Sequence, residues 1–384
     1  MHQGLSRRIQ RLKASPIRDM LREIEKPGMI SLAGGLPATA SLPKFDDGIS
    51  TASLQYGASE GDLQLRELIA TELRMRGLDA DAERVIVLSG SQQGIDLVAK
   101  LAIDEGTPVA VESPTYLAAL QTFSLFGANF LPFDVDKLDA AFTQTKPLLL
   151  YVNPTFRNPD SVVYDAMQRE RLAATCDALD TIVFEDDPYR DLAYESCERT
   201  PVCAGLQRSN WVYQSSFSKT IAPGLRLGYL LCSKQLYTPL LRLKQATDLH
   251  SNRLSQQLVV QLLKDDANIE RVSKICEDYC RRRDCLDELL HRYFGHLAHW
   301  RRPAGGLFFW LKLQAPRTLD TRQLLLKALV KGVAFMPGEP FYCDGRRAAS
   351  ALRLNFTHAD PREFEPALEI LAALVNEELQ RKCP

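Results

Sequence analysis

The sequence predicts an α/β protein whose larger domain is a mostly parallel sheet with helices on both faces, followed by a smaller α+β domain. From Val85 onward, short β-branched runs alternate with helical stretches of roughly a dozen residues, a pattern typical of such a sheet. The runs expected to form strands are residues 85–88, 108–111, 148–152, 182–184, 211–214 and 227–231. The polar motifs described below fall at the ends of these runs, and parallel sheets bind ligands at the carboxyl ends of their strands.

The length of the chain, 384 residues, exceeds the roughly 250–300 residues that one hydrophobic core usually reaches. We therefore expect an N-terminal arm at residues 1–45, a large domain at 46–262 and a small C-terminal domain at 263–384. One or two long helices should lead out of the large domain. Strand-like runs of the small domain are residues 305–311, 332–338 and 351–356.

Composition and charge argue against several classes of protein. The net charge of −1 gives no support for a nucleic-acid or membrane-surface partner, and no run approaches the ~20 apolar residues of a membrane span. The N-terminus lacks the apolar core of a signal peptide. The nine cysteines are scattered, so we expect reduced thiols in a cytoplasmic protein and no metal site.

A serine-rich segment around Lys219 indicates covalent chemistry. Lys219 follows the run 211–214, so it should lie where a strand gives way to a turn. A desolvated lysine amine can form a Schiff base with an aldehyde, and Ser216, Ser218 and Arg226 are donors that suit a phosphate dianion. An aldehyde and a phosphate together suggest pyridoxal phosphate. For this segment alone, a surface lysine in a serine-rich loop is the alternative.

Two further motifs offer groups for a phosphate and for an aromatic ring. Ser91 and Gln92 open a helix after the run 85–88, where free backbone N–H groups and the helix dipole favour an anion. Plain N-capping by Ser91 is the alternative. Tyr116 follows the run 108–111 and could stack on a flat heteroaromatic ring or simply pack against its neighbours.

The run 182–184 is followed by three carboxylates, Glu185, Asp186 and Asp187. A carboxylate at a buried strand end is costly unless it is paired. A buried carboxylate at this position could keep a pyridine nitrogen protonated, which makes the ring an electron sink. A solvated acidic turn would explain all three carboxylates equally well.

Taken in order, these motifs resemble those of the fold type I (aspartate aminotransferase-like) pyridoxal-phosphate enzymes. The resemblance is strongest to the branch with 2-aminoadipate and kynurenine aminotransferases and the catalytic domains of MocR-type regulators, and it runs from about Arg18 to Ala359. It implies a seven-stranded, mostly parallel sheet in the large domain. The segment Glu-Ser-Pro-Thr-Tyr, ending at Tyr116, matches the family letter for letter.

The resemblance also implies roles around the cofactor. Lys219 would hold it covalently, Ser91 and Gln92 would bind its phosphate, and Asp186 would face the ring nitrogen. Asn158 and Tyr189 would hydrogen-bond its phenolic oxygen. Asp160 and Ser161, however, replace the threonine and glycine that end the family's Asn-Pro-Thr-Gly turn, so the local shape of the pocket could differ.

Other residues would reach the same site from elsewhere in the chain. Arg353, in a Leu-Arg-Leu-Asn-Phe setting, would clamp the substrate α-carboxylate through a bidentate pair. Gly34 and Gly35 would line the substrate pocket, to which the N-terminal arm contributes. Tyr56 would reach the cofactor phosphate of the partner in a homodimer. Arg18 would face a second substrate carboxylate, or would pair only with neighbouring charges in solvent.

The expected activity is transfer of an amino group from an L-amino acid to a 2-oxo acid such as 2-oxoglutarate or pyruvate. The mechanism would be ping-pong through an internal aldimine, with Lys219 acting as base and acid. A lyase, decarboxylase or oxygen-using enzyme would need the same lysine, aspartate and arginine. The sensor domain of a MocR-type regulator is a further alternative, which we disfavour because about 17 residues before Arg18 are too few for a helix-turn-helix domain.

Overall fold

The computed structural model describes residues 28, 30–33, 54–138, 142, 144–314, 319–344 and 350–380. Its larger part is built on a seven-stranded sheet with the order β2-β8-β7-β6-β5-β3-β4. The strands are β2 (Val85–Leu88), β3 (Pro108–Glu112), β4 (Asn129–Phe133), β5 (Leu149–Val152), β6 (Ile182–Asp186), β7 (Trp211–Ser216) and β8 (Gly228–Cys232).

The sheet is parallel except for β8, which pairs antiparallel with both β2 and β7. The amino end of β8 therefore lies at the same edge as the carboxyl ends of the other strands. The expected strands all form, with bounds that differ by one or two residues at several ends. Strand β4 was not predicted. It lies at the edge of the sheet, contains Pro132 and is only partly buried, so its sequence lacks the apolar run of a central strand.

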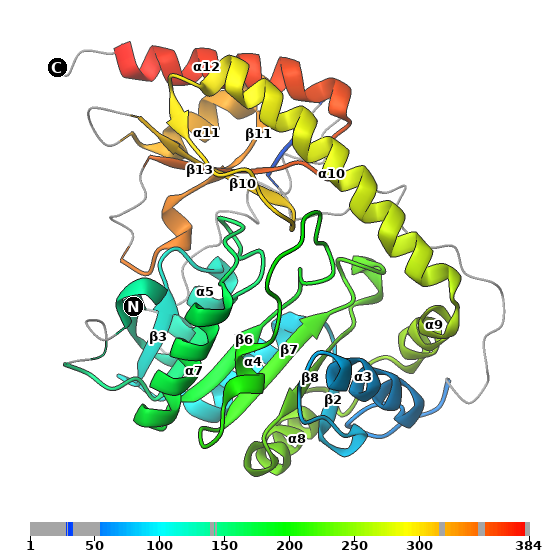
Figure 1. Ribbon diagram of the computed structural model, residues 1–384. Helices are drawn as coiled ribbons and strands as arrows, with labels where there is room; N and C mark the ends of the chain where they lie inside the picture. The colour runs from blue at the N-terminus through cyan, green and yellow to red at the C-terminus, as the bar shows by residue number, and fades with distance from the viewer. Residues whose placement is uncertain are drawn as a thin grey trace, which may run out of the picture.

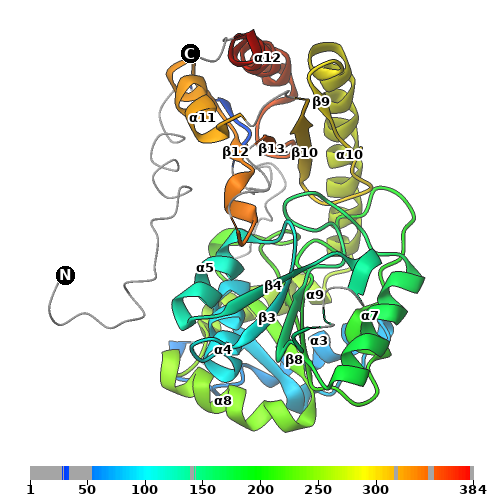
Figure 2. The same ribbon diagram turned by 90° about the vertical axis from the view of Figure 1, so that its left-hand side faces the viewer.

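Both faces of this sheet are buried, because successive side chains of its strands enter two different cores. Val85 and Val87 pack with helices α3, α7 and α9, whereas Ile86 and Leu88 pack with α4, α5 and α8. Figures 1 and 2 show the helices on the two sides of the sheet. Their bounds are α3 (Leu63–Met75), α4 (Ser91–Ala102), α5 (Leu117–Phe126), α7 (Ala166–Leu179), α8 (Lys234–Asp248) and α9 (Arg253–Lys264).

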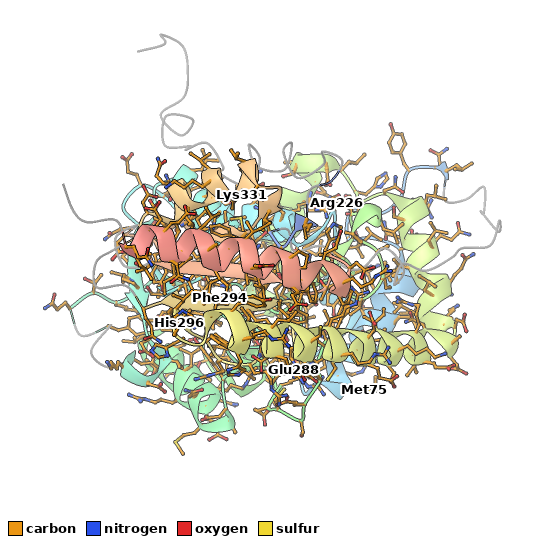
Figure 3. The ribbon with its side chains drawn as sticks, turned by 90° about the horizontal axis from the view of Figure 1, so that it is seen from above. Met75, Arg226, Glu288, Phe294, His296 and Lys331 are labelled. Atoms are coloured by element: carbon orange, nitrogen blue, oxygen red, sulfur yellow. The ribbon has the colours of Figure 1, made fainter. Side chains whose placement is uncertain are left out.

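The smaller part has its own core around an antiparallel sheet of order β12-β13-β10-β9 and a short parallel pair, β1-β11. The strands are β1 (Ile30–Ser31), β9 (Ala298–His299), β10 (Phe308–Leu313), β11 (Val333–Ala334), β12 (Met336–Pro337) and β13 (Ala351–Asn355). The helices are α10 (Ala267–Phe294), α11 (Thr321–Val330) and α12 (Phe364–Gln380). Seen from above, α12 and α10 lie side by side over this part (Figure 3).

The smaller part sits over the edge of the large sheet where the carboxyl ends of β3, β5, β6 and β7 meet, and α10 runs from one part to the other (Figure 1). Direct bonds join the two: Ser161 Oγ donates to the Phe308 carbonyl at 2.9 Å, and the Thr115 amide donates to the Phe341 carbonyl at 2.9 Å. The expected fold class is thus confirmed. Among the described helices, none has the length and apolar character needed to cross a membrane.

Candidate active site

A cavity of about 230 Å³ opens at this edge of the large sheet. Its lining contains every residue that we expected to contact the cofactor of its own subunit. These are Ser91, Gln92, Tyr116, Asn158, Asp186, Tyr189, Ser216, Ser218, Lys219 and Arg226. Tyr56 is not among them, because it was expected to reach the cofactor of the partner. Asn153, which we did not single out, also lines the cavity. It is the first residue after β5, so its position at the end of a parallel strand was a usable signal.

Lys219 lies in the turn after β7, and its side chain is partly buried at the cavity wall. Burial, followed by the guanidinium groups of Arg353 and Arg226, lowers the pKa of Lys219 to about 8. A substantial fraction of this amine is therefore neutral near pH 8, as attack on an aldehyde requires.

The donors suited to a phosphate line the same cavity. Helix α4 begins at Ser91, with Gly90 rather than Ser91 as its N-cap residue, so the N-capping alternative for Ser91 is not what forms. Gly90 has φ +84°, and a Cβ atom there would lie 2.5 Å from Nη2 of Arg226. Arg226 directly precedes Leu227 and β8, and reaches the same edge because β8 runs against the other strands. The helix start, the guanidinium and the hydroxyls of Ser216 and Ser218 form an anion cradle.

Asp186 is the last residue of β6, buried, and aimed into the cavity. Its Oδ2 accepts a hydrogen bond from the Tyr151 hydroxyl at 2.7 Å, while its Oδ1 has no partner among the described residues. Burial raises the pKa of Asp186 to about 6, against the lowering effects of the Tyr151 hydroxyl and of the nearby Gln214 side chain. A cationic N–H placed in the cavity would complete this carboxylate. Nothing in the sequence distinguished Tyr151 from an ordinary core aromatic residue.

The two neighbouring carboxylates face other partners, so the solvated acidic turn is not what forms. Glu185 accepts hydrogen bonds from the amides of Val202 and Cys203, and it is fully buried. Asp187 accepts from the Tyr213 hydroxyl at 3.0 Å and pairs with Arg190. Neither carboxylate lines the cavity.

Arg353, on β13 of the smaller part, does not line the cavity itself but contacts Asn158, which does. Its Nη1 donates to Asn158 Oδ1 at 2.7 Å, and its Nη2 donates to the Ala33 carbonyl at 2.7 Å. The guanidinium lies over the ring of Phe308, 4.0 Å from its centroid, and Nε has no partner among the described residues. Burial lowers the pKa of Arg353 to about 10, so it remains charged at neutral pH. A carboxylate would supply the counter-charge that this group needs.

The remaining predicted residues are not part of this cavity. Tyr56 is 77% exposed, packs edge-on against His250, and lines a different hollow. Gly34, Gly35 and Arg18 lie outside the described residues. No described residues form a group of His, Cys, Asp or Glu that could hold a metal ion.

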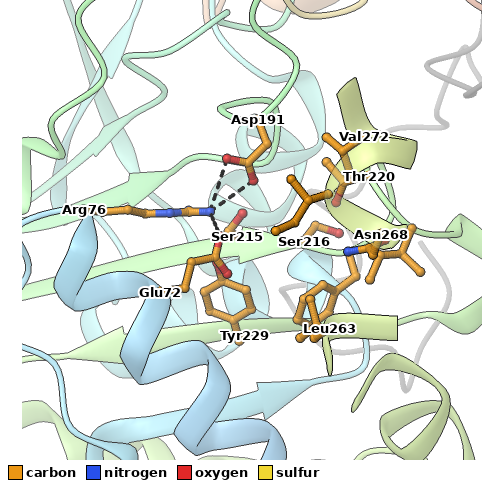
Figure 4. A pocket seen from close by; sticks show the side chains of 13 residues that line it. Glu72, Arg76, Asp191, Ser215, Ser216, Thr220, Tyr229, Leu263, Asn268 and Val272 are labelled. Carbon is orange, nitrogen blue, oxygen red and sulfur yellow. Dashed lines mark hydrogen bonds and ion pairs between the residues drawn. The ribbon is translucent and has the colours of Figure 1, made fainter. Parts of the chain in front are cut away.

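A second cavity of about 250 Å³ is lined in part by the same segment, at Ser215–Phe217, Thr220 and Ile221 (Figure 4). Ser216 lines both cavities. The polar wall of the second cavity includes Arg76, which already forms ion pairs with both Glu72 and Asp191. Its other walls include Phe217, Ile221 and Leu263. This arrangement is charge-paired, unlike that of the first cavity.

The chain belongs to the aminotransferase class I and II family, whose family model matches residues 31–371. The aromatic-amino-acid aminotransferase 1 of Thermococcus litoralis is 34% identical, over 96% of this chain and 93% of that protein. The α-aminoadipate aminotransferase of Thermus thermophilus, solved with N-(5′-phosphopyridoxyl)-L-leucine, is 32% identical with a TM-score of 0.89, covering 98% of each chain. The kynurenine aminotransferase of Pyrococcus horikoshii is 31% identical with a TM-score of 0.91, covering 99% of this chain and 98% of that one.

The protein is thus a pyridoxal-phosphate-dependent aminotransferase of fold type I. The cavity fits this cofactor in three respects. The anion cradle suits its phosphate, the unpartnered Oδ1 of Asp186 suits its ring nitrogen, and Lys219 offers an amine for its aldehyde.

Proposed function

We propose that the enzyme moves the amino group of an L-amino acid to 2-oxoglutarate or pyruvate, with Lys219, Asp186 and Arg353 in the central roles. The observation that carries the assignment is the buried carboxylate of Asp186, whose Oδ1 has no protein donor among the described residues and lines the cavity that also contains Lys219. A buried carboxylate left half satisfied is costly unless a ligand completes it. Pyridoxal phosphate, when bound, supplies an aldehyde and an electron-withdrawing ring.

The residues of the chain would then divide the work. Ser91, Ser216, Ser218 and Arg226 hold the phosphate, and Asp186 keeps the ring nitrogen protonated. Lys219, with its lowered pKa, removes the proton from the substrate Cα and delivers it to the cofactor carbon that takes up the amino group. Arg353 and Asn158 bind the α-carboxylate, which orients the Cα–H bond toward Lys219.

The side chain accepted by the enzyme is also a proposal. The relatives described above are named for aromatic, 2-aminoadipate and kynurenine substrates, which supports a large side chain in this enzyme. Arg18 is our candidate for binding the second carboxylate of 2-oxoglutarate. A panel of amino acids incubated with 2-oxoglutarate, with products identified by mass, would separate transamination from decarboxylation or elimination on the same site.

We also propose a homodimer. Tyr56 is 77% exposed, and Leu54 and Leu249 near it are also largely exposed, which suits a surface covered by a second copy. A cytoplasmic location is supported by the cysteines, since no disulfide joins those in the described part of the chain.

The central test is Lys219→Ala. This variant should still bind pyridoxal phosphate through the cradle, but it should show no Schiff-base absorbance and lose nearly all turnover. Borohydride reduction of the wild type should fix the cofactor on Lys219, as mapped by peptide mass. Lys327→Ala, which changes a partly buried lysine paired with Glu378, serves as the control and should keep its turnover. An adduct on another lysine would refute the assignment.

A further inference from the structure

The loop that carries Asn158 is the place where this chain departs from its family's motif. Asp160 and Ser161 stand where the family has threonine and glycine. Ser161 has φ +53°, in the left-handed region that favours glycine, so the backbone keeps the shape that a glycine would adopt. Its hydroxyl donates to the Phe308 carbonyl at 2.9 Å, a contact that glycine could not make.

Arg157 and Asp160 form a two-point ion pair across this turn. Nε of Arg157 donates to Asp160 Oδ1 at 2.8 Å, and Nη2 donates to Asp160 Oδ2 at 2.5 Å. Nη1 of the same guanidinium reaches Glu112 Oε1 at 3.2 Å. The three side chains are 11%, 12% and 0% exposed, so water screens the pairs weakly.

Glu112 in turn joins this pair to the large sheet. It is the last residue of β3, and it accepts hydrogen bonds from the Tyr164 hydroxyl at 2.6 Å and from the backbone N–H of Asn153 at 2.9 Å. Burial raises the pKa of Glu112 to about 7, and Arg157 acts against this rise. The group Glu112–Arg157–Asp160, here called the clamp, thus ties the turn to the ends of two central strands.

Asn158 lies inside the clamp, between its two loop members, and its amide oxygen already holds Arg353. The far end of the turn is fixed through Ser161 to Phe308, whose ring supports the same guanidinium of Arg353. Movement of the turn would therefore disturb the Asn158 amide and the carboxylate-binding arginine together.

We propose that Arg157 is a positioning residue, which through the clamp fixes the Asn158 amide between the phenolic oxygen of the cofactor and the guanidinium of Arg353. This inference rests on the contact with the phenolic oxygen that the family resemblance implies for Asn158, and on the part proposed above for Asn158 in binding the substrate α-carboxylate. It assigns a function to three residues, Glu112, Arg157 and Asp160, none of which lines the cavity.

The test compares Arg157→Gln and Asp160→Asn with the wild type, each loaded with pyridoxal phosphate. An amide that donates to the phenolic oxygen disfavours the protonated form of the Schiff base beside it. If Asn158 is less firmly held, the midpoint pH of the change in Schiff-base absorbance should therefore rise. We expect this midpoint to rise by about 0.5–1 pH unit, which corresponds to part of the free energy of one charge-assisted hydrogen bond. KM for the amino acid should rise about three- to tenfold, with kcat changed less.

Two controls separate positioning from stability. The double variant should shift the midpoint no further than Arg157→Gln alone, because that change already removes both ion pairs of the clamp. Arg283→Gln removes a guanidinium that is also buried and ion-paired, but on α10, and it should lower the melting temperature without moving the midpoint or KM. If Arg157→Gln does not fold, Asp160→Asn still tests the idea, since it leaves the Arg157–Glu112 pair in place.

The results separate a failure of the positioning role of the clamp from a failure of the role of Asn158 itself. If Asn158→Ala raises the midpoint and both clamp variants leave it unchanged, the clamp is structural and the positioning role is wrong. If Asn158→Ala itself leaves the midpoint unchanged, the proposed role of Asn158 fails instead, and the inference fails with it.

Discussion

Two buried arginines, Arg353 and Arg76, occupy opposite electrostatic situations. They are 4% and 9% exposed. Arg76 donates to the Tyr213 hydroxyl at 2.9 Å and pairs with Asp191 at 3.0 Å and with Glu72 (Figure 4). Burial lowers its pKa, but these neighbours and Tyr229 outweigh that effect and raise it. Arg353 donates only to neutral oxygens, and no carboxylate lies at ion-pair distance within the described part of the chain.

The difference shows how a binding arginine can be told from a structural one. A buried cation is costly unless an anion compensates it. Glu72 and Asp191 compensate Arg76 within the chain, so its contribution is to stability. In the role proposed for Arg353, the substrate carboxylate compensates its charge, and folding has already removed the guanidinium from water before the substrate binds.

The largest effect is expected for Arg353→Leu. The value of kcat/KM should fall about a thousandfold for every amino acid, the loss of one buried bidentate charge pair. The free energy of unfolding of the cofactor-free protein should change by less than about 1 kcal/mol, because no carboxylate partner is left behind. Steady-state kinetics and urea unfolding measure the two quantities. A large loss of stability with unchanged KM would reverse the assignment of the two arginines.

A smaller effect, and of the opposite kind, is expected for Arg76→Met. Unfolding should cost about 2–4 kcal/mol less, because Glu72 and Asp191 lose their partner, although both are partly open to solvent. The kcat/KM of the folded fraction should stay within about threefold of the wild type. The control is Arg74→Met. Arg74 lies in the last turn of α3, just before Arg76, and is exposed, so this change should alter the free energy of unfolding by less than about 0.5 kcal/mol. A drop in kcat/KM without loss of stability would mean that Arg76 acts on the site through Tyr213 and Asp187.

The smallest effect concerns the third cation of this comparison, Lys219, whose pKa is lowered to about 8 in the fold. Unfolded chains return a lysine to about 10.4, so between these values the unfolded state binds more protons and stability rises with pH. From about pH 8 to pH 9.5, the cofactor-free wild type should gain about 1–2 kcal/mol relative to Lys219→Met. Denaturant unfolding at several pH values checks this. Parallel profiles for the two proteins would mean that the amine titrates normally.

Local sequence was enough to predict the central strands and the residues that follow them. Strand ends in a parallel sheet converge on one edge, so residues far apart in the chain, such as Ser91, Asp186 and Lys219, could be expected to meet. Lys219 and Arg226 lie on the same short connection between the neighbouring strands β7 and β8, so they too could be expected to lie close together. Edge strand β4 escaped prediction because its burial is slight and its pattern weak.

Only the tertiary structure decided which polar groups are left for a ligand. Glu185, Asp186 and Asp187 are three carboxylates in a row, and the packing around the end of β6 places only Asp186 on the cavity wall. Glu185 bonds to backbone amides and Asp187 to the Tyr213 hydroxyl, both away from the cavity. The contact of Asn158 with Arg353 joins residues 195 apart, and no local pattern indicates it. Hydrogen bonding and ion pairing depend on distances of a few ångströms between distant segments, so whether a charge is compensated can be known only after the chain has folded.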